Sequence, residues 1–221
     1  MKKNIYLFIV SFFLLAFIVF TVIVKTVDVA FIVTNGTYIG LSHFNYDVGN
    51  WVISLGKMKD MKVISDILLY LILGYSVIFF AIGIIQWIKG KTLKAVDKTI
   101  YLLGACYVLV GLLYLVFELV KVNFSPISDN GLKASYPSTH VFVGSSLVLI
   151  NSFAAIKMLK IEAKLFRVII YTSSLVICVL LAFTRLLSLK HWCTDIVASF
   201  LLIPVVYFLY LHFYNYLHQE A

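Results

Sequence analysis

The chain alternates between long apolar stretches and shorter polar segments. Six stretches of about 20 residues or more lack the alternation of a half-buried strand, and they lie at residues 5–24, 63–88, 100–120, 139–158, 168–187 and 195–214. A helix needs about 20 apolar residues to cross a bilayer, where every backbone polar group must be satisfied within the protein. The pattern therefore predicts an all-α, polytopic membrane protein with six transmembrane helices in a bundle.

Composition agrees with this interpretation. Apolar residues make up 62% of the 221 residues and charged residues 13%, against about 45–50% and about 25% in soluble domains. The net charge of +8 does not indicate a nucleic-acid ligand, because the lysines lie between the apolar stretches. Three cysteines, an odd number, define no disulfide framework. We expect one membrane domain, residues 1–221, whose partners are membrane lipids and a lipid substrate.

The positive charges predict the orientation of the bundle. If the six helices alternate in direction, one side of the membrane receives Lys2, Lys3, Lys89, Lys91, Lys94, Lys98, Lys157, Lys160, Lys164 and Arg167. The positive-inside rule assigns this side to the cytoplasm, so both termini are expected there, in a multi-pass protein of the cell membrane. No small-residue cleavage site follows the first stretch, so it is expected to be a retained helix rather than a signal peptide.

The outer segment 25–62 is rich in aromatic and aliphatic residues, such as Phe44, Trp51 and Ile53. Two interpretations remain open: a lid or interfacial helix lying on the membrane, or an aromatic belt that only anchors the loop. His43 in this segment is expected to be a surface residue.

Polar and ionisable residues near membrane depth gather in two places. One is residues 136–140 at the start of the fourth predicted helix, and the other is residues 184–195 around the turn between the fifth and sixth. Such residues are costly in a membrane and mark functional sites by default. Because the predicted topology puts both places on the outer face, we expect an active site there.

A histidine and an aspartate in the second cluster suggest nucleophilic or base chemistry. His191 and Asp195 are spaced i, i+4. If the sixth helix begins a turn early, the carboxylate can accept the proton of one ring nitrogen and leave the other free.

The remaining polar residues suit an anion. His140 lies at a helix N-terminus, where backbone N–H groups and the helix dipole favour negative charge, and Ser138 and Thr139 add hydroxyl donors. The forked guanidinium of Arg185 matches phosphate oxygens. Together the two clusters suit phosphoryl transfer through a phosphohistidine.

These residues resemble motifs of the membrane-bound type 2 phosphatidic acid phosphatase superfamily. The second motif of that family, Pro-Ser-Gly-His, corresponds to residues 137–140, which read Pro-Ser-Thr-His. The third, Ser-Arg, five residues, His, three residues, Asp, is matched in full spacing by Thr184, Arg185, His191 and Asp195. The resemblance implies that His191 is the nucleophile, Asp195 its orienting partner and His140 the acid that protonates the leaving oxygen. It also implies that Arg185, Ser138 and the backbone near Thr139 bind phosphate, with no metal or other cofactor.

The resemblance also implies a substrate class, a lipid phosphate or diphosphate. The six-helix size and the outer site resemble bacterial enzymes that recycle undecaprenyl diphosphate, the carrier lipid of cell-wall synthesis. Phosphatidylglycerophosphate and phosphatidic acid remain open.

The first motif departs from the family. It normally reads Lys, six residues, Arg-Pro, and counting back from Pro126 places Glu118 and Ser125 at the two cationic positions. Lys121 and Lys133 are the candidate substitutes that bind phosphate, and Lys190 is the next to consider. Glu118 is expected either to pair with Lys121 or to face elsewhere, since a carboxylate would oppose phosphate binding.

Two other functions stay open. The missing first motif favours a catalytically weakened superfamily member that serves as a lipid-binding or scaffold protein. A small transporter is the other alternative. A transporter should have polar groups near the membrane midplane, whereas the middles of the predicted helices are expected to be bare.

Overall fold

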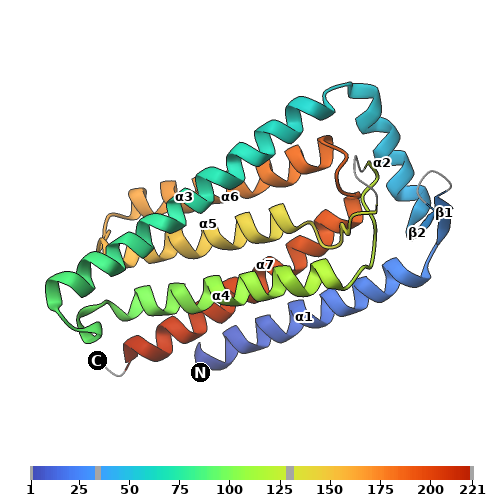
Figure 1. Cartoon of the computed structure of the whole chain (residues 1–221). Coiled ribbons are helices and arrows are strands. Elements are labelled where there is room, and N and C mark those ends of the chain that lie inside the picture. Colours follow the sequence, from blue (N-terminus) through green and yellow to red (C-terminus); the bar gives the residue numbers. More distant parts are fainter. Residues whose placement is uncertain (1, 33–35, 128–131, 220–221) are drawn as a thin grey trace.

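The computed structural model of the chain describes residues 2–32, 36–127 and 132–219, which are mostly helical. Six helices are long and apolar enough to cross a membrane, and they run side by side in one bundle (Figure 1). They are α1 (Lys2–Thr26), α3 (Met58–Gly90), α4 (Lys98–Leu119), α5 (Thr139–Met158), α6 (Lys164–Leu187) and α7 (Cys193–Gln219). The predicted all-α, multi-pass membrane fold is confirmed.

Five of the six spanning helices extend past the predicted apolar stretches at one or both ends, because polar residues at a helix end do not have to lie in lipid; α5 has the predicted bounds. Helix α3 begins at Met58, five positions before the expected residue 63. It ends at Gly90, and the next residue, Lys91, caps the helix in a left-handed backbone conformation (φ 52°). Asp97 caps α4 by accepting a hydrogen bond from the backbone N–H of Thr99 at 2.7 Å. Pro204 lies inside a continuous α7, as expected.

The central helix of the bundle is α5, which packs against α3, α4, α6 and α7. Its membrane-spanning window is 67% buried, against 6% for α1, which packs mainly on α7. Small residues let the neighbouring helices approach α5 closely. A Cβ added at Gly144 would lie only 2.7 Å from a methyl group of Leu181 on α6, so a larger residue there would force the Leu181 side chain to shift.

Polar side chains do occur in the middle of the bundle, contrary to expectation. The Asn151 side chain on α5 donates to the hydroxyl of Ser76 on α3 at 2.8 Å and accepts a hydrogen bond from the hydroxyl of Tyr107 on α4. Sequence alone did not distinguish these buried groups, because each is an uncharged residue in a strongly apolar stretch. The three groups satisfy one another, which is how helices in lipid accommodate polar side chains.

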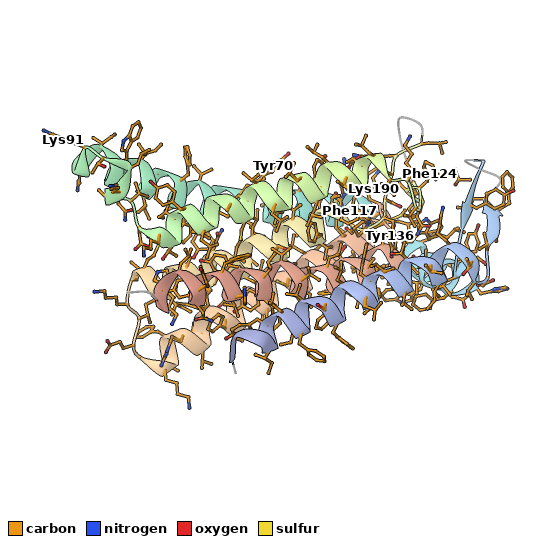
Figure 2. The ribbon with its side chains drawn as sticks, turned by 90° about the horizontal axis from the view of Figure 1, so that it is seen from below. Tyr70, Lys91, Phe117, Phe124, Tyr136 and Lys190 are labelled. Carbon is orange, nitrogen blue, oxygen red and sulfur yellow. The ribbon has the colours of Figure 1, made fainter. Side chains whose placement is uncertain are left out.

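The segment between α1 and α3 forms a hairpin and a short helix at one end of the bundle (Figure 1). Strands β1 (Ala30–Ile32) and β2 (Thr37–Ile39) are antiparallel, with Ala30 opposite Ile39. Helix α2 (Ser42–Leu55) then lies across the ends of the spanning helices. At the opposite end the 3-10 helix η1 (Leu93–Ala95) joins α3 to α4, so Lys91 and Lys190 lie at opposite ends of the bundle (Figure 2).

Helix α2 has three distinct faces. Its buried face packs on the turn between α6 and α7, where Val52 contacts Leu187 and Leu189. A second face is polar, and the third exposes Phe44 and Trp51. An exposed apolar stripe beside a polar one is typical of a helix at a membrane surface. His43 is exposed as expected, and its Nδ1 lies 2.7 Å from the Asp28 carboxylate.

Candidate functional site

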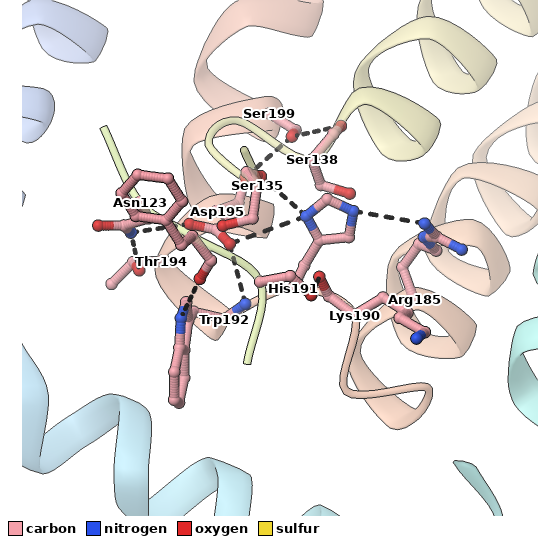
Figure 3. A network of polar contacts seen from close by, with 12 residues as sticks. Asn123, Ser135, Ser138, Arg185, Lys190, His191, Trp192, Thr194, Asp195 and Ser199 are labelled. Carbon is pink, nitrogen blue, oxygen red and sulfur yellow. Dashed lines mark hydrogen bonds and ion pairs between the residues drawn. The ribbon is translucent and has the colours of Figure 1, made fainter. Parts of the chain in front are cut away.

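The two predicted clusters meet at the end of the bundle that carries α2 (Figure 3). The backbone N–H of Ser138, just before α5, donates to the carbonyl of Asp195 in the first turn of α7 at 3.0 Å. The hydroxyl of Ser199 lies 2.9 Å from both the Ser138 and the Asp195 carbonyl oxygens. These bonds fix the start of α5 against the start of α7, so segments about fifty residues apart in sequence form one site.

His191 is buried in the turn between α6 and α7, and its two ring nitrogens have different surroundings. Nδ1 lies 2.8 Å from the backbone carbonyl of Ser135. A carbonyl oxygen only accepts hydrogen bonds, so Nδ1 carries the proton and Nε2 keeps its lone pair. Nε2 faces the guanidinium of Arg185, whose Nη2 is 3.5 Å away. The free nitrogen therefore points toward an anion-binding group.

Asp195 lies behind this ring, and its side chain is fully buried. Its carboxylate accepts hydrogen bonds from the Asn123 side chain at 2.8 Å and from the backbone N–H of Trp192 at 2.9 Å. One oxygen is 3.7 Å from Nδ1 of His191, which is an ion-pair distance rather than a direct hydrogen bond. Because α7 begins only at Cys193, His191 precedes the helix. The Ser135 carbonyl therefore makes the shorter contact, and the carboxylate supplies charge beside the ring.

The surroundings of His191 predict a pH dependence. Burial lowers the pKa of His191 below its usual value of about 6.5, because the imidazolium loses its hydration. The neutral, nucleophilic ring then persists to lower pH than a free imidazole would. If His191 is the nucleophile, the acidic limb of the kcat/KM profile should fall below pH 6.5. Steady-state assays from pH 4 to 9 measure this limb, and the ionisation of the substrate is titrated separately. An acidic limb above pH 7 that the ionisation of the substrate does not explain would contradict the prediction.

Donors for an anion surround the free nitrogen of His191. Arg185 is buried on α6, and its Nη1 donates to a carboxylate oxygen of Asp66 at 3.3 Å. Its Nε has no hydrogen-bond partner among the residues that the structure describes, and the same holds for the buried hydroxyl of Ser138. Buried donors without partners are uncommon in folded proteins. Arg185 also lines the cavity described below, whereas the Ser138 hydroxyl is fully buried behind its lining.

His140 opens α5 on the other side of this space. Its Nε2 lies 3.2 Å from the carboxylate of Asp66, a residue in the third turn of α3. Asp66 was not predicted to be a site residue from the sequence. It is the one Asp, Glu, Lys or Arg within the apolar stretch 63–88, and an ionisable residue inside a spanning stretch was the signal that could have identified it.

A cavity of about 920 Å³ lies between α3, α4 and α5 and ends at these residues. Its inner part is mostly apolar, with Leu73, Val77 and Phe80 on α3 among the lining residues, although Ser76 and Tyr107 also line it. From Asp66 to Phe80, α3 advances about 21 Å, so the cavity reaches well into the membrane-spanning part. Its polar end is lined by Lys62, Asp66, Glu118, Ser125, Lys133, Thr139, His140, Arg185, Lys190 and His191.

The structure places the residues at the altered first motif in different roles. Glu118 lines the cavity, so the expectation that it pairs with Lys121 or faces elsewhere is wrong, and the described residues include no ion pair between the two. Lys121 is exposed and lies outside the cavity lining, whereas Lys133 lines it. The hydroxyl of Ser125 lies 2.8 Å from the carbonyl of Lys190, which stabilises the turn that carries this cation.

The predicted site residues thus fall into two groups. Those that meet around the polar end of the cavity are His140, His191, Asp195, Arg185, Ser138, Thr139 and Lys133, whereas Lys121 lies apart from them. Lys62 and Lys190 add two further cations to the lining. Within the described parts of the chain, no group of three or more His, Cys, Asp or Glu side chains is placed to hold a metal ion.

Two histidines and an arginine thus face a cavity that extends between the spanning helices of a six-helix membrane bundle, an arrangement suited to phosphate chemistry in a membrane. Comparison with known proteins identifies the family. The sequence model of the PAP2 superfamily matches residues 114–219, which hold both histidines and the whole third motif. This C-terminal part of the chain therefore matches the PAP2 superfamily.

One solved structure is similar over nearly the whole chain. It is the crystal structure of a transmembrane PAP2-type phosphatidylglycerolphosphate phosphatase from Bacillus subtilis, with a TM-score of 0.70 and 18% sequence identity. The alignment covers 96% of this chain and 98% of that chain, so the shared fold includes α1–α3, which the family model does not match. No curated protein matches the sequence.

Proposed function

We propose that the protein is an integral-membrane phosphatase that hydrolyses a lipid phosphate or diphosphate through a phosphohistidine intermediate. One observation carries the proposal: the free Nε2 of the buried His191 faces Arg185 at the polar end of a cavity whose other end is apolar. A nucleophile, a phosphate-binding cation and a tail-binding surface are then in one place. The match of residues 114–219 to the PAP2 superfamily supports the same reaction class.

The proposed chemistry follows from this arrangement. Nε2 of His191 attacks phosphorus, the bond to the leaving oxygen breaks, and that oxygen takes the bonding electron pair and a proton from His140. Water then gives a proton to His140 and attacks the phosphohistidine, which releases inorganic phosphate and restores both rings. Arg185 and the hydroxyl of Ser138 hold the phosphate oxygens as negative charge develops. No step in this scheme needs a metal ion or another cofactor.

The charges around the cavity support a highly charged head group. Four cations line it, from Lys62, Lys133, Arg185 and Lys190, whereas the two carboxylates of Asp66 and Glu118 also face it. A diphosphate carries more negative charge than a monophosphate and can contact cations that are spread over several elements. We therefore keep undecaprenyl diphosphate as the first candidate substrate, ahead of phosphatidylglycerophosphate and phosphatidic acid.

The lysine distribution supports an orientation in the cell membrane. We propose that both termini face the cytoplasm and that the site lies at the outer surface. Cys193 begins α7 at the site end, whereas Cys106 and Cys178 are buried in the bundle. A membrane-impermeant thiol reagent added to intact cells should label Cys193 in preference; labelling that requires opened cells would contradict this orientation.

Phosphate release by the purified protein tests the activity. In nanodiscs that contain one of the three candidate lipids, we expect release of inorganic phosphate that a chelator does not reduce, fastest with undecaprenyl diphosphate. Activity that chelation removes would contradict the metal-free scheme. Tight binding of a lipid without release of phosphate from any of the three would instead favour a scaffold or lipid-binding protein. The carboxylates of Asp66 and Glu118 in the cavity are compatible with that alternative, because they oppose the binding of a phosphate group.

A further inference from the structure

Asp66 makes two contacts that no motif of the sequence accounts for. One carboxylate oxygen lies 3.2 Å from Nε2 of His140 and 3.3 Å from Nη1 of Arg185. The side chain is 33% exposed and lines the cavity, so it belongs to the site rather than to the packed core. It comes from α3, which lies outside the part of the chain that the family model matches.

The need for this carboxylate follows from the surroundings of His140. The ring lies in the first turn of α5, where the helix dipole disfavours added positive charge. It is also largely buried, which disfavours its charged form, and Arg185 from α6 and Lys133 from the loop before α5 act on it electrostatically in the same direction. Lys62 on α3, Lys190 on the turn and Glu118 on α4 line the same cavity.

A general acid must carry its proton when the leaving group departs. These cations oppose a protonated His140, and among the residues that the structure describes Glu118 lines the cavity without an ion pair to the ring. The Asp66 carboxylate is the one anion within ion-pair distance of His140 in the described parts of the chain. Its charge stabilises the imidazolium, and its position fixes the ring at Nε2.

We propose, on the basis of the proposed function, that Asp66 is the positioning residue for the proton-transfer step. It holds the ring through Nε2, so that Nδ1 gives its proton to the leaving oxygen, and it keeps the ring protonated until the bond to phosphorus breaks. Two His–Asp pairs then face each other across the phosphate site with opposite tasks. Asp195 lies beside a buried ring that must be neutral to attack phosphorus, whereas Asp66 contacts a partly exposed ring that must be charged to donate a proton.

The leaving group separates this role from a structural one. An alkyl phosphate such as phosphatidic acid releases an alkoxide that needs a proton, whereas a nitrophenyl phosphate releases a stable phenolate that does not. We expect Asp66→Asn to lower kcat/KM about 10- to 100-fold for phosphatidic acid and several-fold at most for nitrophenyl phosphate, because general acid catalysis contributes about 10²- to 10⁴-fold. The basic limb of the phosphatidic acid profile should also move to lower pH, since the ring now loses its proton more easily.

Two further variants guard against trivial explanations. Asp66→Glu keeps the charge and should recover part of the activity on phosphatidic acid. Asp60→Asn removes a carboxylate two turns earlier on the same helix, at an exposed position outside the cavity lining, and should behave as wild type. Thermal unfolding of each purified variant confirms that the bundle is intact.

The outcomes are distinct. Equal losses on the two substrates with an unmoved basic limb would mean that Asp66 acts through Arg185 or the fold, which overturns the proposal. Faster turnover of Asp66→Asn would also overturn it, because the carboxylate would then merely occupy the phosphate position. If the wild type releases phosphate from neither substrate nor from the three lipid candidates, the proposed phosphatase function itself fails, and this proposal fails with it.

Discussion

Replacing His191 by alanine is expected to lower phosphate release from lipid substrates by at least about 10⁴-fold, because the variant lacks the atom that attacks phosphorus. The structure makes this ring hard to replace. It is buried, its Nδ1 lies against the Ser135 carbonyl, and its Nε2 faces Arg185. No other described imidazole lies on the same side of the cavity, since His140 approaches from α5 and contacts Asp66. Single-turnover assays in nanodiscs measure the loss.

A matched control for this variant is His43→Ala. His43 lies at the same end of the bundle on α2, but its side chain is exposed and contacts Asp28 rather than the cavity. This control should keep nearly full activity. Mass spectrometry of the acid-quenched wild type should also find phosphate on a peptide that contains His191. Phosphate release by His191→Ala at the wild-type rate would show that the nucleophile is wrongly assigned.

Neutralising Lys133 or Lys190 is the second large effect we expect. The two cations expected from the first motif are absent, and these lysines line the polar end of the cavity instead. A charge-assisted contact to phosphate is worth about 1.5 to 3 kcal/mol, so each alanine variant should lose roughly ten- to a hundredfold in kcat/KM. Assays with undecaprenyl diphosphate measure this, and the loss should be larger than with phosphatidic acid if both phosphates are bound.

The chain supplies its own controls for the lysine variants. Lys57 and Lys59 are exposed near the start of α3, and Lys121 is exposed after α4, all outside the cavity lining. Their alanine variants should change kcat/KM only slightly. A large loss for Lys121→Ala beside silent Lys133→Ala and Lys190→Ala would restore Lys121 as the substitute cation and contradict the arrangement described above.

Sequence predicted the spanning helices well because each one leaves a simple physical record, an unbroken apolar stretch as long as the membrane is thick. The single turn of extra helix at the start of α3 left no such record, since Lys59 and Asp60 are as compatible with a loop as with a helix end. The conformation of residues 42–55, which form α2, could not be decided from the sequence for a similar reason. Apolar and polar residues alternate among three faces of this helix, and only the packing of Val52 and Gly49 on the turn between α6 and α7 defines it.

The site was predictable where its residues lie close in sequence, as for His191 and Asp195. Two contacts were beyond the sequence for different reasons. The partner of Nδ1 is the backbone carbonyl of Ser135, and no side-chain pattern encodes a carbonyl. Asp66 lies more than seventy positions before His140, so only the packing of α3 beside α5 brings them together. Glu118 was expected to pair with Lys121 or to face elsewhere, because a carboxylate opposes phosphate binding; cations from distant parts of the chain share its cavity, and only the fold brings them there.

The side of the cavity between α3 and α4 affects how the activity of the protein should be assayed. The two helices diverge toward the site end (Figure 1), and Tyr70 and Phe80, which line the cavity on α3, are 70% and 66% exposed. The cavity is thus open sideways, toward acyl chains rather than water. A substrate that arrives by this route moves in two dimensions, so turnover should follow its mole fraction in the bilayer or micelle. Adding inert detergent at constant total substrate should slow the reaction by dilution within the surface.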